Sequence, residues 1–211
     1  MRIKICIAVA ALICSGIGQS ASAQNQFSNP GFEAPITFDG PPFVGSWEGF
    51  SSGGPASSGN LSITPRTGLQ HLGLSITSQV NAFAGAFQDV AGLTAGSLVT
   101  FSGWHMTTSN PLDLGIEFRI EWRNSVSNTE INRTPNMTTI PTGAYTEFSL
   151  NSVVPAGADT ARCVYAIQTF GGGPTHNGVV YVDDASFIPA PATFALAMGG
   201  MGMVGLRRRR A

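Results

Sequence analysis

The stretch GIEFRIEWR, residues 115–123, decides the fold class because apolar and charged side chains alternate along its whole length. Successive side chains of a β-strand point to opposite faces of a sheet. The stretch is therefore predicted to be a strand with one face in a core and the other directed outward. The core-facing set is Ile116, Phe118, Ile120 and Trp122, and the outward set is Glu117, Arg119, Glu121 and Arg123.

Similar short runs fill most of the chain, and turns rich in glycine, proline and asparagine separate them. No long stretch has helical periodicity, so the chain is predicted to be all-β. About nine or ten strands in one domain suit a β-sandwich of the jelly-roll type. The segment around Trp47 is expected to be a loop. The other strands are expected at residues 61–64, 72–77, 82–90, 98–106, 145–150, 161–170 and 179–187.

Residues 1–23 have the three parts of a secretory signal peptide: a basic start, an apolar run at 5–13 and the small-residue site Ala21-Ser22-Ala23. The mature chain is therefore expected to begin at Gln24. One alternative is a membrane anchor, for which the apolar run is too short. Another is a lipoprotein modified at Cys14, but the residue before that cysteine is a bulky isoleucine.

The chain ends with IPAPATFALAMGGMGMVGLRRRRA, residues 188–211, in which a proline motif, an uncharged apolar run and four arginines follow one another. As a helix, residues 192–206 would extend roughly 22 Å at about 1.5 Å per residue. A hydrocarbon core is about 30 Å thick, so the run suits a transient membrane anchor. Arg207–Arg210 are expected to stay on the cytoplasmic side. The alternative is a disordered basic tail on a soluble domain.

This order of Pro189-Ala190-Pro191, apolar helix and terminal arginine cluster resembles the PEP-CTERM sorting signal of Gram-negative bacteria. Ala190 stands where the motif usually has glutamate. The resemblance implies that residues 189–211 are a substrate of an exosortase, a membrane cysteine protease-transpeptidase. It also implies export across the inner membrane and delivery to the cell surface or the extracellular matrix.

Residues 24–188 remain as one domain of about 165 residues. This domain has no lysine, and its five arginines stand against twelve acidic residues, a formal charge of −7. An acidic domain does not attract phosphate backbones, so nucleic acid is not an expected partner. Cys163 is the one cysteine of the mature chain, which excludes an intrachain disulfide. It is predicted to be a small buried residue, with a catalytic thiol as the alternative.

A second resemblance covers nearly the whole of residues 24–188. The order of the motifs along this range is similar to that of the galactose-binding-like jelly roll, as in carbohydrate-binding modules of families four, nine and twenty-two. The resemblance implies a non-catalytic domain that binds extracellular polysaccharide. The segments that carry it are SNPGFE (28–33), GSW (45–47), RTGLQ (66–70), FQDV (87–90), LTAGSLVTFSGW (93–104), EFRIEW (117–122), VVPAGA (153–158) and VYVDDASF (180–187).

The same resemblance implies a structural Ca²⁺ held by Glu33 of the opening motif and Asp183 of the closing strand, with Asp184 as the alternate ligand. Backbone carbonyls of residues 68–71 would assist. Ca²⁺ prefers several hard oxygen ligands, and a cation offsets the repulsion between neighbouring carboxylates. Pairing of the first and last strands would bring these acids together. The alternative is that both carboxylates face solvent separately.

A sugar-binding site is predicted at Trp104, Arg119 and Glu121. Trp104 shares one face of strand 98–106 with Thr100 and Ser102, opposite to the face of Phe101. An outward Trp104 beside the charged row of residues 115–123 would stack on a sugar ring while Arg119 and Glu121 bind its hydroxyls. Alternatively, the charged row is a solvated sheet face and a loop partly buries Trp104.

Catalysis is not expected. Glu117 and Glu121 lie four residues apart on one strand, about 13 Å at about 3.3 Å per residue. The paired carboxyls of glycosidases are about 5–9.5 Å apart, and the three histidines lack the spacing of zinc ligands. We therefore predict an exported, surface-sorted, non-catalytic domain that binds glycan. The alternatives are a structural or matrix protein without sugar specificity and a secreted hydrolase.

Overall fold

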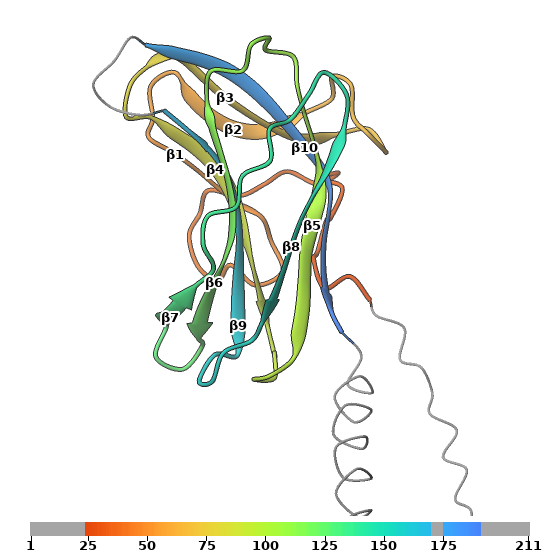
Figure 1. The fold of residues 1–211 in the computed structure, drawn as a ribbon, viewed down its shortest axis with the longest axis vertical. Coiled ribbons are helices and arrows are strands. Elements are labelled where there is room, and N and C mark those ends of the chain that lie inside the picture. Colours follow the sequence, from red (N-terminus) through yellow and green to blue (C-terminus); the bar gives the residue numbers. More distant parts are fainter. Residues whose placement is uncertain (1–23, 170–174, 191–211) are drawn as a thin grey trace, which may run out of the picture. The chain divides into compact units, whose positions relative to one another are not determined.

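The computed structural model describes residues 24–169 and 175–190, and all of their regular elements are β-strands. The strands form two five-stranded antiparallel sheets around one apolar core (Figure 1). The predicted all-β sandwich is therefore confirmed. The signal peptide predicted at 1–23 and the sorting helix within 191–211 lie outside the described residues. Within the described ranges, no helix is long and apolar enough to cross a membrane.

We call the two layers sheet A and sheet B, each with a long central strand from the second half of the chain. Sheet A has the strand order β1-β4-β9-β6-β7 and consists of β1 Glu48–Ser51, β4 Phe83–Ala91, β9 Thr160–Gln168, β6 Gly115–Asn124 and β7 Thr129–Arg133. Sheet B has the order β2-β3-β10-β5-β8 and consists of β2 Ala56–Leu61, β3 His71–Gln79, β10 His176–Pro189, β5 Leu98–Thr107 and β8 Thr146–Val153.

Strand β6 follows the predicted alternation, and all four apolar side chains on its inner face are buried. Strand β4 shows the reverse of the usual size pattern, because Ala84 and Ala86 face the core while Phe83 and Phe87 face outward. The small alanines let sheet B approach closely at this edge. Cα atoms of β4 come within 8 Å of those of β2 and β3, whereas stacked sheets usually lie about 10 Å apart.

The short strands at the sheet edges differ from the sequence prediction. The strand expected at residues 61–64 is wrong: β2 ends at Leu61, and residues 62–70 form a loop, which we call the strap. The segment around Trp47, expected to be a loop, contributes β1, and β7 was not expected. Both pair with one neighbour only, so partner strands rather than their own apolar patterns define them.

The opening and closing motifs of the domain lie side by side. The Gln26 backbone N–H donates to the Phe187 carbonyl at 2.8 Å, and the Ala185 N–H donates to the Pro30 carbonyl at 2.8 Å. Strand β10 bulges between Asp183 and Ser186, where it pairs with β5. The N-terminal segment is therefore held against the bulge of β10, in line with the expected pairing of the two ends of the domain.

Cys163 lies on the inner face of β9 and is fully buried. Burial raises the pKa of its thiol well above the ordinary value. A reactive cysteine needs a stabilised thiolate and access to solvent, so the environment of Cys163 is that of a structural core residue.

Candidate functional site

The strap crosses the outer side of sheet B and is tied to three acidic residues. The fully buried Asp183 carboxylate accepts hydrogen bonds from the backbone N–H groups of Arg66 at 2.8 Å and Thr67 at 3.2 Å. Glu33 accepts from the Leu69 N–H at 3.0 Å and from the Gln70 N–H at 3.4 Å. Carboxylates of the opening and closing motifs thus satisfy the backbone donors of the strap.

Asp184 completes the attachment from the bulge of β10, where its backbone is left-handed with a φ of 48°. Its carboxylate accepts from the Thr67 hydroxyl at 2.6 Å and pairs with the Arg66 guanidinium. Burial raises the pKa of the neighbouring Asp183 carboxyl, although three backbone N–H groups that donate to it act in the opposite direction.

The three acids predicted as calcium ligands are brought together. A Cβ atom built on Gly31 would lie 3.8 Å from Asp183 Oδ1, Asp184 Oδ1 and Glu33 Cγ. The concentration of hard oxygens and the excess of negative charge over the single guanidinium fit a Ca²⁺ ion. Their oxygens also accept hydrogen bonds from the strap, and no group of three or more His, Cys, Asp or Glu among the described residues is arranged around a metal position. Calcium binding therefore stays a prediction.

Trp104 lies on the outer side of sheet B, beneath the strap. The carbon at the centre of the Arg66 guanidinium lies 3.9 Å from the centroid of the Trp104 ring, a cation–π contact. The Tyr145 hydroxyl fixes the strap further by donating to the Thr64 carbonyl at 3.2 Å. One face of Trp104 is therefore covered by Arg66, as in the alternative in which a loop partly buries this side chain.

Arg119 and Glu121 lie on the outer side of sheet A, because β6 belongs to that layer. Trp104 is on β5 in sheet B, so the structure separates it from the other two predicted ligand-binding residues. The predicted placement of Trp104 beside the charged row is wrong. The alternation of each strand was read correctly, but the sequence pattern did not indicate that the two strands belong to different layers.

The charged row of β6 is internally paired. The Arg119 guanidinium donates to Glu121 Oε1 at 2.9 Å through Nε and at 2.7 Å through one terminal nitrogen, and its other terminal nitrogen pairs with Glu117. The Asn136 side-chain amide donates to Glu117 at 2.6 Å. Fixed, partly buried polar groups of this kind can orient the hydroxyls of a ligand without reorganising.

Four phenylalanines lie on the same outer side of sheet A: Phe50 of β1, Phe83 and Phe87 of β4, and Phe43 of the loop before β1. Phe87 is 4.9 Å from Phe43 and 6.1 Å from Phe50 between ring centroids, and Phe50 is 6.2 Å from Phe83. In the register of the sheet, Phe87 pairs with Val164 and Val164 pairs with Arg119. The aromatic group on β1 and β4 and the charged row on β6 thus lie on either side of the central strand β9.

Arg162 links the aromatic group to the sheet. Its guanidinium carbon lies 4.2 Å from the Phe87 centroid and 4.7 Å from the Phe43 centroid. Its nitrogens donate to both carboxylate oxygens of Asp89, at 2.7 and 3.0 Å. This bidentate ion pair holds the arginine in place. We call the whole surface the sheet A face, composed of Phe43, Phe50, Phe83, Phe87, Arg162, Gln168, Glu117, Arg119 and Glu121.

Sequence reasoning missed the aromatic part of the sheet A face. Phe83 and Phe87 alternate with alanines, and in such a run the larger apolar residues are normally expected in the core. Gln88 shares the parity of the alanines and gave no sequence signal for an inward face, because its burial depends on hydrogen bonds that it accepts from and donates to the backbone of Ser28. The face of β4 was decided by these tertiary contacts.

No protein-family model and no curated protein matches this sequence. Among solved structures, the CBM22-2 xylan-binding domain of Paenibacillus barcinonensis Xyn10C has a TM-score of 0.52 at 22% identity, covering 74% of this chain and 98% of that chain. Its CBM22-1 xylan-binding domain has a TM-score of 0.50 at 12% identity, covering 81% of this chain and 97% of that chain.

The enzymatically active domain of tailspike protein 4 from bacteriophage CBA120 has a TM-score of 0.56 at 15% identity. The match covers 78% of this chain, but this chain spans only 21% of that structure. These likenesses show that the chain has the β-sandwich fold of carbohydrate-binding modules, as the resemblance in the sequence implied.

Proposed function

We propose that this protein is an exported, non-catalytic domain that binds an extracellular polysaccharide on the sheet A face. The observation that carries the proposal is the combination of half-exposed aromatic rings and a fixed polar row on one side of one sheet. Aromatic rings offer apolar platforms to sugar rings, and the paired Arg119 and Glu121 offer donors and acceptors to hydroxyls. The fold is one in which xylan-binding domains are known.

A non-catalytic role is supported by the way in which the carboxylates of this face are used. Glu117 and Glu121 both bind the guanidinium of Arg119, which lies between them. The arginine and the two acids form a single rigid unit, whereas a hydrolase needs one acid to deliver a proton and a second to act on the sugar.

The proposal includes the route to the cell surface. Strand β10 ends at Pro189, and the Ala190 N–H donates to the Leu98 carbonyl at 2.7 Å. The first two residues of the Pro-Ala-Pro motif therefore still contact the folded domain. An exosortase would act on the chain after this point, and residues 192–206 would anchor it in the membrane until then. Mass spectrometry of the mature protein from a host with and without an exosortase tests this by locating the new C-terminus.

The proposal also includes a structural Ca²⁺ held by Glu33, Asp183 and Asp184. The ion would neutralise the excess negative charge of this cluster and fasten the opening motif to the closing strand. It would stabilise the fold and take no part in sugar binding.

Sugar binding is tested by retention of the recombinant domain, residues 24–190, on insoluble xylan, galactan, β-glucan and chitin. Phe83→Ala, at a ring that is 44% exposed, is expected to weaken retention about tenfold without changing the unfolding midpoint. Leu61→Ala on sheet B, 41% exposed, is the matched control and should bind as the wild type does. If no polysaccharide retains the wild type, the domain is a structural or matrix protein without sugar specificity.

A further inference from the structure

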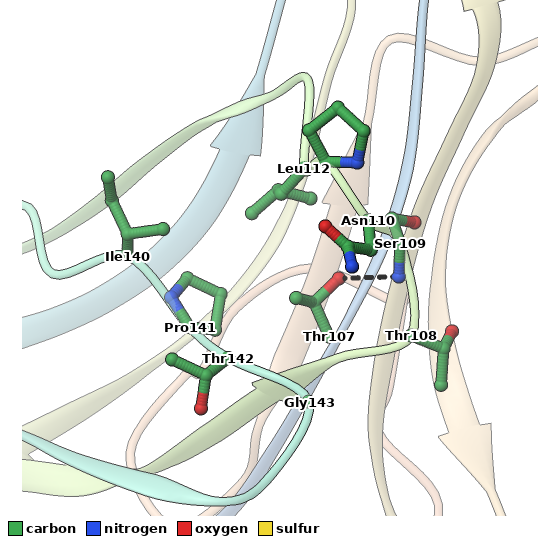
Figure 2. A pocket seen from close by; sticks show the side chains of 10 residues that line it. Thr107, Thr108, Ser109, Asn110, Leu112, Ile140, Pro141, Thr142 and Gly143 are labelled. Carbon is green, nitrogen blue, oxygen red and sulfur yellow. Dashed lines mark hydrogen bonds between the residues drawn. The ribbon is translucent and has the colours of Figure 1, made fainter.

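A cleft with a volume of about 670 Å³ lies at the end of the sandwich where β5 leads into β6. Residues 107–112 form one wall and residues 140–143 form the other, as Figure 2 shows. Leu112 and Asn110 of the first wall lie across from Ile140 and Pro141 of the second. The cleft lies beyond the strands that carry the sheet A face.

The first wall is fixed by hydrogen bonds to β10. The buried Thr107 hydroxyl donates to the Val179 carbonyl at 2.6 Å and accepts from the Ser109 N–H at 3.0 Å (Figure 2). The Val179 N–H donates to the Ser109 hydroxyl oxygen at 3.0 Å. The two walls are joined because the Thr107 N–H donates to the Thr142 carbonyl at 2.9 Å. The cleft is therefore largely formed before any ligand enters.

The lining contains no ionisable side chain, so the cleft offers no counter-charge to a phosphate, sulfate or carboxylate group. It combines apolar surfaces with neutral hydrogen-bonding groups. In the described part of the chain, the Thr108 hydroxyl and the Asn110 amide make no hydrogen bond, and Ile140 is 75% exposed. This mixture suits an uncharged sugar ring, which carries hydroxyls and C–H surfaces. The lining residues are Thr107, Thr108, Ser109, Asn110, Pro111, Leu112, Ile140, Pro141, Thr142 and Gly143.

A smaller hollow of about 220 Å³, whose lining includes Asp113 and His176, lies next to the cleft. Leu112 lines both hollows, and the smaller one extends to Gly115 and Gln168. These two residues are register partners on β6 and β9, and Gln168 also pairs with Phe83 of β4. The smaller hollow therefore reaches the end of the sheet A face at Gln168 and borders the cleft at Leu112.

We propose that the cleft is an end subsite, which takes the terminal uncharged sugar residue of a polysaccharide whose preceding residues lie on the sheet A face. This inference rests on the proposed function and adds a feature to it. The end subsite makes the domain bind chain ends more tightly than internal segments of the same polysaccharide. Thr108 and Asn110 bind the hydroxyls of the terminal sugar, and Ile140 covers its C–H surface.

The test uses Gly143, which lines the cleft and has open space where a Cβ atom would stand. Gly143→Leu therefore adds an apolar side chain at the wall of the cleft with no atom within 4 Å of its Cβ. Gly59→Leu on β2 of sheet B is the matched control, because that glycine also has no atom within 4 Å of a built Cβ. Affinities are measured by calorimetry for xylobiose to xylohexaose, or for the corresponding series of the polysaccharide that retains the wild type.

The wild type and Gly59→Leu are expected to gain affinity with each added sugar until the chain reaches the cleft. Gly143→Leu should lose about tenfold for the longest oligosaccharide and little for the shortest. In ¹⁵N spectra of the wild type, the Asn110 side-chain amide should shift on addition of the longest oligosaccharide.

Equal affinities of Gly143→Leu and wild type at every length, with shifts confined to the sheet A face, would overturn the end subsite and leave the proposed function intact. If no polysaccharide or oligosaccharide binds the wild type, the proposed function fails and the end subsite fails with it. Shifts of Asn110 that persist in Phe83→Ala would show that the cleft binds sugar independently of the sheet A face, and would support the subsite.

Discussion

Sheet A and sheet B each present an arginine held by acidic side chains near aromatic rings, but the two arrangements differ in what they leave open. On sheet B, Arg66 lies over Trp104 and belongs to a strap whose backbone N–H groups donate to the buried Asp183 and to Glu33. On sheet A, Arg162 pairs with Asp89 and lies against Phe87. Arg119 pairs with two glutamates of its own strand, and Phe83 remains exposed. The same residue types therefore attach a loop on one side and form the proposed binding surface on the other.

The difference teaches that residue type alone does not identify a sugar site. Trp104 is the side chain that would normally be chosen as the stacking platform, and the Arg66 guanidinium of the strap covers it. The phenylalanines of sheet A lie on the outer face because alanines occupy the inner positions of β4. Exposure was set by neighbours from other parts of the chain.

The largest expected effect breaks the sheet B arrangement. Asp183→Ala removes a buried carboxylate that accepts from the N–H groups of Arg66, Thr67 and Asp184. Each of these part-buried donors that is left without its acceptor costs about 1 kcal/mol or more, so we expect a loss of about 3 kcal/mol in urea-induced unfolding. Glu147→Ala, at an exposed site on the same sheet, is the control. An unchanged midpoint for Asp183→Ala would mean that the strap is not fixed by this residue.

The second-largest expected effect concerns His105, which is buried in the core between the two sheets. His105 is fully buried, its Nδ1 lies 2.7 Å from the Tyr165 hydroxyl, and burial lowers its pKa from 6.5 to about 4. Because the unfolded chain binds the proton more readily, the stabilisation from neutral His105 is complete above about pH 6.5 and is lost as the pH falls toward 4. The loss amounts to up to about 3 kcal/mol.

Unfolding curves from pH 7 to pH 4 measure this loss, and His105→Asn keeps a polar partner for Tyr165 while removing the titration. The variant should show a smaller decrease in unfolding free energy over this range. If the unfolding free energy falls with pH equally steeply in the wild type and in His105→Asn, the acid sensitivity belongs to groups on the sheet faces instead.

The third effect sharpens the role of the acidic cluster. If Glu33, Asp183 and Asp184 hold Ca²⁺, free calcium at 100 times its dissociation constant should stabilise the domain by about 2.7 kcal/mol. Differential scanning calorimetry with calcium and with a chelator measures the shift in Tm. The shift should vanish in Glu33→Gln, and a Tm that calcium does not change in the wild type would leave the strap fixed by hydrogen bonds alone.

The smallest effect uncovers Trp104. Arg66→Ala removes a partly exposed ion pair and a cation–π contact, together worth about 1 kcal/mol. The other two tryptophans are buried, so a red shift in fluorescence would report the exposure of Trp104. Glycan binding is expected to stay unchanged, and a gain in binding would reveal Trp104 as a sugar platform that Arg66 covers.

Much of the fold could be predicted from the sequence, because alternation in β6 and β5 and the order of turns specify strands that need burial on one face. The edge strands β1 and β7 could not be predicted, since each is defined by its partner rather than by its own apolar pattern. The cleft at the end of the sandwich was also beyond prediction. Its walls, residues 107–112 and 140–143, are loops that lie together because Thr107 binds Thr142.

The sequence by itself determined the class of fold and the two faces of β5 and β6. These follow from periodicity and from motifs, which are properties of local sequence. Only the tertiary structure decided that Trp104 and Arg119 belong to different layers, and that Phe83 and Phe87 face outward. Strand alternation specifies two sides but not which sheet a strand joins, and that assignment depends on backbone pairing between residues far apart in the chain.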